Sequence, residues 1–269
     1  MPVSINTKSQ QHKMVRLFGI NFDAINMNQV VSNVLDWTDE RAYDCHYIVT
    51  PNVDHVVKLQ QHYGLKQAYK EASLTVVDGK PVLWASKLFN PLPEVIPGSD
   101  LCPAIFDAAC QKQQRVRVFL LGAAEGVAEK AADKIHKKWP WVTVCGCYSP
   151  AMGFDSTSRE NIKVIKMINE LKPDLLLVGL GAPKQEIWMQ QNAKQLQVKV
   201  GLCIGATIDF IAGEKSRAPK LMRMMGMEWV FRALTEPRRL MGRYLHDAMV
   251  FPQIVIKEFF VDEQKVSRE

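Results

Sequence analysis

Short runs of β-branched and aliphatic residues recur along the first three-quarters of the chain, and a segment with helical spacing of apolar positions follows each run. The runs predict strands at residues 47–49, 74–77, 116–121, 141–144, 175–178 and 198–202. Tight hairpins cannot join parallel neighbours, so strands that alternate with helices indicate a parallel sheet with crossover helices. The pattern predicts an α/β fold with an open, mostly parallel, Rossmann-like sheet and helices on both faces.

The strand pattern then stops, and the rest of the sequence has the composition of basic helices that contain methionine and tryptophan. Breaks between these helices are expected near Pro219, Pro237 and Pro252, because proline removes a helical hydrogen bond. The chain is therefore expected to divide into an α/β body, residues 1–213, and a basic helical appendage, residues 214–269.

Composition indicates a folded chain whose charge is unevenly distributed. Of the 269 residues, 47% are hydrophobic and 23% are charged, which suits a globular core. The formal net charge is +6, and residues 214–244 hold eight basic and three acidic side chains, a net +5. Scattered charge often marks a solvated helix face, but these basic residues alternate with many large apolar ones. This combination favours a helix that lies on an anionic membrane surface or closes over a polyanionic ligand.

Targeting segments and metal-binding motifs are not apparent in the sequence. Residues 1–8 are too polar for a signal peptide. Apolar runs stay well short of the roughly 18 residues that cross a bilayer, so a cytoplasmic location is expected. The six cysteines include no C-x-x-C pair and the six histidines no H-E-x-x-H motif. We therefore expect reduced, buried thiols and no metal site.

Polar side chains follow two of the predicted strands, at the edge where open α/β sheets bind ligands. Asp78 comes directly after the second run and could act as a general base, although an aspartate before glycine is also common in turns. Thr50 and Asn52 follow the first run and could hydrogen-bond a sugar or a phosphate. Alternatively, Asn52 or Asp54 caps the helix that comes next.

Loops with glycine follow three further runs. Gly122 and Gly126 could leave backbone N–H groups free for a phosphate, or they could simply allow a turn. Their G-x-x-x-G spacing departs from the G-x-G-x-x-G of dinucleotide-binding folds. The next loop combines small residues, which admit a ligand close to the backbone, with polar side chains: Gly181, Ala182, Pro183, Lys184 and Gln185. Pro183 could equally start a helix, and Asp209 follows the sixth run.

Taken in order from about residue 16 to 246, the sequence resembles the WecG/TagA/CpsF glycosyltransferases. The blocks that carry the resemblance are Thr50-Pro51-Asn52, Asp78-Gly79-Lys80-Pro81, Pro97-Gly98-Ser99-Asp100, Tyr148-Ser149-Pro150, residues 173–186, Gly205-Ala206 with Asp209-Phe210, Arg217-Ala218-Pro219, Glu228-Trp229 and Glu236-Pro237-Arg238-Arg239. Departures fall at Thr207 and Ile208, and at Gly242-Arg243, where relatives often carry adjacent arginines.

The resemblance implies an inverting, metal-independent enzyme that uses no cofactor. It implies transfer of a sugar, commonly of the N-acetylmannosamine type, from a UDP-sugar to a sugar on a polyprenyl diphosphate, in the synthesis of cell-surface polysaccharides. In such enzymes an α/β body binds the nucleotide, while a C-terminal appendage supplies arginines and contacts the membrane. The protein would then work in the cytoplasm, on the inner face of the cell membrane. A UDP-glucose or UDP-uronic-acid donor also fits the resemblance.

Site residues carry over from the resemblance one by one. Asp78 would be the base, and Thr50, Asn52 and Gln185 would line the sugar pocket. The departure at Arg243 shifts weight to three other cations of the appendage: Arg232 and Arg239 as catalytic groups, and Arg238 as a binding residue.

Simple chemistry agrees with these assignments. The sequence has no D-x-D motif to hold a divalent metal, so guanidinium groups would have to stabilise the leaving diphosphate. Two other classes stay open at this stage: a Rossmann-type NAD(P) oxidoreductase, and a non-catalytic binder of nucleic acid or membrane that uses the basic appendage. The favoured partners are a UDP-sugar, a polyprenyl-linked acceptor and an anionic membrane surface rather than nucleic acid, and assembly into a homo-oligomer stays open.

Overall fold

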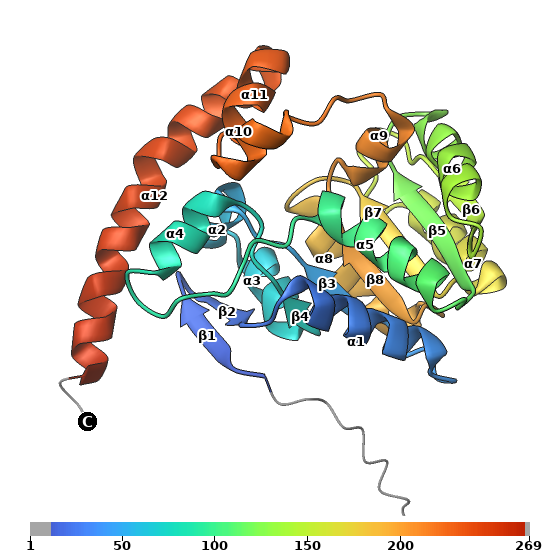
Figure 1. The fold of residues 1–269 in the computed structure, drawn as a ribbon, viewed down its shortest axis with the longest axis horizontal. Helices are drawn as coiled ribbons and strands as arrows, with labels where there is room; N and C mark the ends of the chain where they lie inside the picture. The colour runs from blue at the N-terminus through green and yellow to red at the C-terminus, as the bar shows by residue number, and fades with distance from the viewer. Residues whose placement is uncertain (1–11, 267–269) are drawn as a thin grey trace, which may run out of the picture.

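The structure is a computed structural model that describes residues 12–266, with side chains for residues 12–260 (Figure 1). Residues 1–8, on which the expectation of no signal peptide depends, lie outside this range. A parallel sheet of six strands has the order β4-β3-β8-β7-β5-β6. Its strands are β3 (His46–Val49), β4 (Leu74–Thr75), β5 (Val116–Gly122), β6 (Val142–Tyr148), β7 (Leu175–Gly179) and β8 (Val200–Cys203). The prediction of an open, parallel α/β sheet is confirmed.

Helices cover both faces of the sheet, as predicted. One face packs against α1 (Met27–Asp39), α5 (Gly98–Gln111), α6 (Val127–Lys138) and α9 (Thr207–Ala212). The other face packs against α2 (Val53–Leu59), α3 (Tyr63–Glu71), α4 (Lys80–Ser86), α7 (Arg159–Leu171) and α8 (Lys184–Asn192), which a short 3-10 turn follows at Ala193–Gln195. Side chains of a strand alternate between faces, so Leu175 and Leu177 of β7 join the first core and Leu176 and Val178 the second. Burial on both faces explains why this strand reads as a continuous apolar run.

An antiparallel hairpin, which the sequence analysis did not predict, precedes the sheet. It consists of β1 (Met14–Leu17) and β2 (Ile20–Asp23), joined by a two-residue turn in which Phe18 (φ 56°) and Gly19 (φ 78°) both have left-handed backbones. The Phe18 ring is buried and packs edge-on against Phe251, with 5.7 Å between ring centroids. The Asp23 carboxylate accepts a hydrogen bond from the Thr75 backbone N–H at 2.6 Å. The hairpin therefore links the edge of the sheet to the last helix.

Three helices form the appendage: α10 (Lys220–Met224), α11 (Glu228–Thr235) and α12 (Pro237–Val266). The predicted breaks at Pro219 and Pro237 are confirmed, since a helix starts at or directly after each. The predicted break near Pro252 is wrong, because this proline lies inside α12. α12 runs along the side of the body against α2 (Figure 1). Phe251, which packs against Phe18, and the buried Ile254 hold the helix on either side of Pro252. None of the helices in the described range is long and apolar enough to cross a bilayer.

Candidate active site

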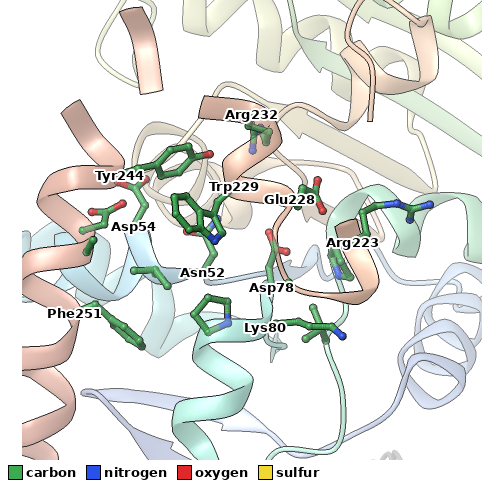
Figure 2. Close-up of a pocket in the computed structure, with 18 of the residues that line it drawn as sticks. Asn52, Asp54, Asp78, Lys80, Arg223, Glu228, Trp229, Arg232, Tyr244 and Phe251 are labelled. Carbon is green, nitrogen blue, oxygen red and sulfur yellow. The ribbon is translucent and has the colours of Figure 1, made fainter. Parts of the chain in front are cut away.

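A cavity of about 610 Å³ lies between the carboxyl ends of β3 and β4 and the three helices of the appendage (Figure 2). The body contributes residues from three segments: Asn52 to Asp54, Asp78 to Pro81, and Val95, Pro97 and Asp100. The appendage contributes Lys220, Arg223, Met224, Gly226, Glu228, Trp229, Arg232, Arg243, Tyr244, Asp247, Ala248, Phe251 and Pro252. The body and the appendage, predicted as separate parts, thus form opposite walls of one site, while the boundary drawn between them at residue 213 stays a prediction.

Asn52 lies on the floor of the cavity, where it caps α2. Its side-chain oxygen accepts a hydrogen bond from the His55 backbone N–H at 3.4 Å, which confirms the predicted cap. Thr50, at the end of β3, is buried, and its hydroxyl donates to the Cys203 carbonyl on β8 at 3.4 Å. Thr50 therefore fixes the backbone that presents Asn52, and its assignment to a sugar pocket stays a prediction.

Asp78 stands at the centre of the cavity, below Glu228 and beside Asn52 (Figure 2). Gly79 follows it with φ +100°, a conformation that turns the chain sharply into α4. Loss of water around the partly buried carboxyl group, together with the negative charge of Glu228, raises the pKa of Asp78 to about 6. His55, Arg232 and a hydrogen bond from the Asn52 side chain limit this rise. The result is a carboxyl group that is mostly ionised at neutral pH yet remains basic enough to accept a proton.

Five basic side chains line the cavity: Lys80, Lys220, Arg223, Arg232 and Arg243. Two of the arginines face acidic groups. Arg223 Nη1 lies 3.6 Å from Asp100 Oδ1, and Arg243 Nη1 lies 3.6 Å from Asp54 Oδ2.

Within the described part of the chain, Arg232 forms no ion pair, although its charge acts on Asp78. Arg232 is thus the predicted cation that the fold brings to Asp78. Arg223 and Arg243 are cations of the cavity to which the sequence analysis assigned no role.

Arg238 and Arg239 lie outside the cavity lining, at the exposed start of α12. The guanidinium of Arg239 is paired with Glu236 at 2.6 Å. The contacts of Arg238 and Arg239 with the leaving group remain a prediction. These contacts would require both side chains to move from the positions seen here.

The residues of the glycine-containing loop after β7 are not part of the cavity lining. α8 begins directly after Pro183, in agreement with the helix-start interpretation. The side-chain oxygen of Gln185 accepts hydrogen bonds from the backbone N–H groups of Gly181, at 3.3 Å, and Gly205, at 3.1 Å. The Ala182 carbonyl accepts one from Lys58 Nζ at 3.1 Å. The buried Gln185 therefore ties two loops of the sheet edge together, and its role in sugar binding stays a prediction.

Three further predicted residues also lie apart from the cavity lining. A Cβ atom on Gly122 would lie only 2.5 Å from the Gly179 carbonyl oxygen, so glycine is required there for β5 and β7 to approach closely. Lys184 Nζ lies 6.0 Å from the centroid of the Phe154 ring. Asp209 lies in the first turn of α9, and its backbone carbonyl accepts a hydrogen bond from the Glu214 N–H. Their assignments to ligand binding stay predictions.

An apolar wall, to which the sequence analysis gave no function, faces this polar floor. Trp229 of α11 packs edge-on against Tyr244 of α12 with 6.1 Å between ring centroids, and Phe251 lies two turns further along α12. In the sequence, only the Glu228-Trp229 block of the family resemblance pointed to Trp229 as a residue of the site. Tyr244 and Phe251 carried no local signal, because only the docking of α12 brings them to the cavity.

The described residues include one group that could offer three metal ligands within 4.8 Å of one another, and it is distant from the cavity. It consists of Glu40, Asp44 and His46, which lie around the amino end of β3, opposite the carboxyl end that carries Asn52. All six cysteines are free thiols, and Cys45, Cys102 and Cys203 are buried.

Comparisons with known proteins show the family to which this chain is similar. A sequence model of the glycosyl transferase WecG/TagA/CpsF family matches residues 15–265. The chain is similar to an N-acetylglucosaminyldiphosphoundecaprenol N-acetyl-beta-D-mannosaminyltransferase of Staphylococcus aureus strain MRSA252, with 33% identity over 227 residues that cover 84% of this chain and 86% of the relative. The protein of the same description from strain NCTC 8325 / PS 47 is 32% identical over the same share of both chains. Because the family match includes both the body and the appendage, the chain belongs to the WecG/TagA/CpsF family of glycosyltransferases.

Proposed function

We propose that this glycosyltransferase moves an N-acetylmannosamine-type sugar from UDP to an N-acetylglucosamine carried on undecaprenyl diphosphate, with inversion at the anomeric carbon. The name of the similar S. aureus enzyme supports the sugar and the acceptor. The cavity supports the chemistry, and one observation carries it: Asp78 and Arg232 line the same cavity, and the charge of Arg232 acts on the Asp78 carboxyl group.

Asp78 is the base of the proposed reaction. An acceptor hydroxyl attacks the anomeric carbon, its proton passes to the Asp78 carboxylate, and the bond between the anomeric carbon and the UDP oxygen breaks. A pKa of about 6 keeps the carboxyl mostly ionised at neutral pH and more basic than an exposed aspartate. A single displacement of this kind gives the inverted product.

Arg232 stabilises the departing UDP, because charge grows on the diphosphate as the bond breaks. A guanidinium group can hold two phosphate oxygens at once, which suits it to this task. Arg223 and Lys220 add positive charge to the lining of the cavity. Arg238 and Arg239, at the start of α12, could reach a diphosphate only by leaving their exposed positions.

The appendage also contacts the membrane in this proposal. α12 exposes Met241, Leu245, Met249, Ile256 and Phe260, spaced four or seven residues apart and so on one stripe of the helix. An apolar stripe on a helix with a basic start suits the surface of an anionic bilayer, where the polyprenyl acceptor resides. The enzyme would therefore act in the cytoplasm, on the inner face of the cell membrane.

The test is incubation of the full-length protein with a short-chain polyprenyl diphosphate that carries N-acetylglucosamine, together with one of four donors. The donors are UDP-N-acetylmannosamine, UDP-N-acetylglucosamine, UDP-glucose and a UDP-uronic acid. The masses of the lipid products identify the sugar transferred, and NMR of the product gives the anomeric configuration. We expect one added N-acetylhexosamine from the first donor, with turnover that persists in EDTA.

Each other outcome changes a specific part of the proposal. Transfer of glucose or a uronic acid would replace the donor and keep the site. A product with retained configuration, or turnover that EDTA abolishes, would contradict the roles of Asp78 and Arg232. Absence of transfer from every donor would overturn the proposed reaction.

A further inference from the structure

Beneath the cavity, a buried ionic pair contacts the floor without lining it. His55 of α2 and Glu186 of α8 are 9% and 1% exposed, and His55 Nε2 lies 3.2 Å from Glu186 Oε1. Burial of two charged groups is costly, and a buried pair is not by itself a source of stability. The reaction proposed above uses neither residue, so their position requires another explanation.

We propose that His55 and Glu186 are a positioning pair, which holds the Asn52 amide with its NH2 group toward the Asp78 carboxylate. This inference rests on the proposed function of Asp78 as the base. It assigns His55 and Glu186 no contact with the substrate, because both act through Asn52.

The hydrogen bonds form a continuous chain from the base to the sheet edge. The His55 imidazole contacts Asn52 Oδ1 through Nδ1 at 2.8 Å and Glu186 Oε1 through Nε2 at 3.2 Å. Asn52 in turn donates to Asp78 from its amide NH2 group. At the other end, Gln185 Nε2 donates to the same Glu186 oxygen at 2.7 Å. This series of hydrogen bonds links Asp78 to Gln185, which holds two loops of the sheet edge in place.

The proton count of the imidazole affects how firmly the orientation of the Asn52 amide is held, in addition to the cap from the His55 backbone N–H. Asn52 Oδ1 and Glu186 Oε1 are both acceptors, so an imidazole that contacts both must donate from both ring nitrogens. Burial opposes the charge on His55, but the hydrogen bond and the negative charge of Glu186 outweigh burial and raise the pKa of His55. A doubly protonated His55 keeps the Asn52 oxygen on its own side, and the amide NH2 group must then point away, toward Asp78.

A neutral imidazole could maintain only part of this arrangement. With a single proton on Nε2, the ring would still bind Glu186, and its bare Nδ1 would accept the Asn52 backbone N–H, which lies 3.3 Å away. The Asn52 amide oxygen would then lose its shorter hydrogen bond, to the imidazole at 2.8 Å, and keep only the His55 backbone N–H at 3.4 Å, so the amide would be held less firmly. An oxygen turned toward Asp78 would repel the carboxylate that the NH2 group otherwise stabilises.

Charged and titratable groups from several elements surround His55, Glu186 and Asp78. The groups that act on His55 are Glu186 on α8, Asp54 on α2 and Asp78 after β4. The Tyr69 ring on α3 packs edge-on against the imidazole, and the buried thiol of Cys203 on β8 lies near Glu186. Asp78 is also influenced by Glu228 and Arg232 on α11. Among these groups, Glu186 is the one in direct hydrogen-bond contact with His55 Nε2.

The test is Glu186→Gln in the full-length protein, because this substitution keeps the volume and removes the charge. Without the carboxylate, His55 becomes neutral, and Asp78 loses both the cation and the ordered donor that lower its pKa. Carbon-13 NMR of labelled aspartate, with Asp78→Asn to assign the signal, follows the Asp78 carboxyl in the absence of substrate. We expect its midpoint to move upward from about 6.

Turnover provides a second readout, which a purely structural role would not produce. An upward shift of about one unit lowers kcat/KM about fivefold at pH 6 and hardly at all at pH 8, because the base is ionised at the higher pH in both proteins. Asn161→Ala is the control. Asn161 on α7 is buried and accepts a hydrogen bond at 2.7 Å from Nε1 of Trp188, which lies on α8, the helix that carries Glu186. Its loss should lower stability and leave the Asp78 midpoint in place.

The outcomes separate this inference from the proposed function. An Asp78 midpoint that stays at about 6 in folded Glu186→Gln would overturn the positioning role. If that variant does not fold, nitrogen-15 NMR of the unaltered protein decides: both ring nitrogens of His55 must carry protons at pH 7, and a single proton on Nε2 would contradict the inference. A shifted midpoint without transfer of any sugar would support the pair and reject the reaction.

Discussion

At the scale of the single residue, Asp78 experiences opposing influences. Burial and Glu228 favour its neutral form, while Arg232, His55 and Asn52 favour its ionised form. The balance leaves a pKa of about 6, between that of an exposed aspartate and that of a carboxyl with no compensating neighbours. Enzymes often reach a useful base in this way, by partial burial rather than by a special residue type.

Substitution of this base should reduce turnover much more than nucleotide binding. Asp78→Asn keeps the shape and loses the proton acceptor, so kcat should fall by about 10²- to 10⁴-fold. The Kd for UDP, measured by calorimetry, should change less than about threefold, because the proposed diphosphate contacts come from the appendage. Turnover equal to that of the unaltered enzyme would reject the role of Asp78.

The raised pKa also predicts opposite effects of pH on activity and stability. Activity should rise with pH through about 6 as Asp78 ionises. Because the folded pKa lies above the unfolded value of 3.8, the contribution of Asp78 to stability is fully present below pH 3.8 and is lost as pH rises through about 6. Ionisation of Asp78 in the folded protein lowers the free energy of unfolding at neutral pH by at most about 3 kcal/mol.

Denaturant unfolding of Asp78→Asn and the unaltered protein provides the measurement. The substituted protein should be the more stable of the two at pH 8, and the difference should shrink toward pH 4. A difference that stays constant over this range would contradict the raised pKa.

At the scale of the element, periodicity identified every strand of the main sheet but not the hairpin or the full length of α12. β1 and β2 have only four residues each, and their turn places Phe18 in a left-handed conformation that sequence patterns assign to glycine or asparagine. Pro252 predicts a break from local chemistry alone, whereas packing on both sides keeps the helix continuous.

The same limit applies to the candidate site. Local sequence pointed to Asp78 and Asn52, because both follow strands whose carboxyl ends must meet at one edge of a parallel sheet. Tyr244 and Phe251 reach the cavity only because α12 packs along α2. The pair formed by His55 and Glu186 joins positions 131 residues apart. Contacts of this kind depend on how elements pack, which a single sequence does not specify.

The turn between α10 and α11 should control the closure of the cavity. Gly226 has φ +71°, and a Cβ atom there would lie 2.7 Å from the Trp84 ring and 3.0 Å from Lys80 Cβ, both on α4. Gly226→Ala should therefore strain the turn and loosen its contact with α4, by about 1–2 kcal/mol. A loss of this size, expressed fully in binding, weakens UDP binding about 5- to 30-fold, as calorimetry can measure.

Gly242→Ala is the matched control in the same appendage. Gly242 lies within α12, and a Cβ atom there would meet nothing within 4 Å. Alanine should stabilise the helix by about 0.5–1 kcal/mol and leave the Kd for UDP unchanged. Equal effects of the two substitutions on UDP binding would contradict a specific role for the turn at Gly226.

At the scale of the whole molecule, the cavity exists only where body and appendage meet. The polar contacts that hold the parts together include Arg217 with Asp100 at 2.8 Å, Arg223 with Asp100, Arg243 with Asp54, and Lys80 with the Met224 carbonyl. The exposed apolar stripe of α12 belongs to this same assembly. A membrane that binds the stripe therefore binds the helix that completes the cavity.

Binding to vesicles should depend on this stripe. We expect the full-length protein to cosediment with vesicles that contain anionic phosphatidylglycerol, and to do so less in high salt. The double variant Leu245→Glu with Met249→Glu places charges on two exposed positions of α12 and should weaken binding at least about tenfold, since each buried apolar side chain contributes about 1.5–3 kcal/mol.

Ile162→Glu is the control for this experiment. Ile162 is 70% exposed on α7 of the body, so its substitution adds a similar surface charge away from the stripe. Its binding to vesicles should match that of the unaltered protein. Cosedimentation that the double variant leaves intact would exclude α12 as the contact surface.

The order of the cavity walls along the chain affects how the enzyme is made. Asn52 and Asp78, on the floor, leave the ribosome early, whereas Tyr244 and Phe251 are among the last residues of the site to be synthesised. Domains generally fold as units during synthesis, with N-terminal domains first. Asp78, the proposed base, is therefore synthesised long before Arg232, the proposed cation of the appendage. A polypeptide cut short by a late stop codon would carry the base but could not use it, which protects the cell's supply of activated sugar from incomplete copies.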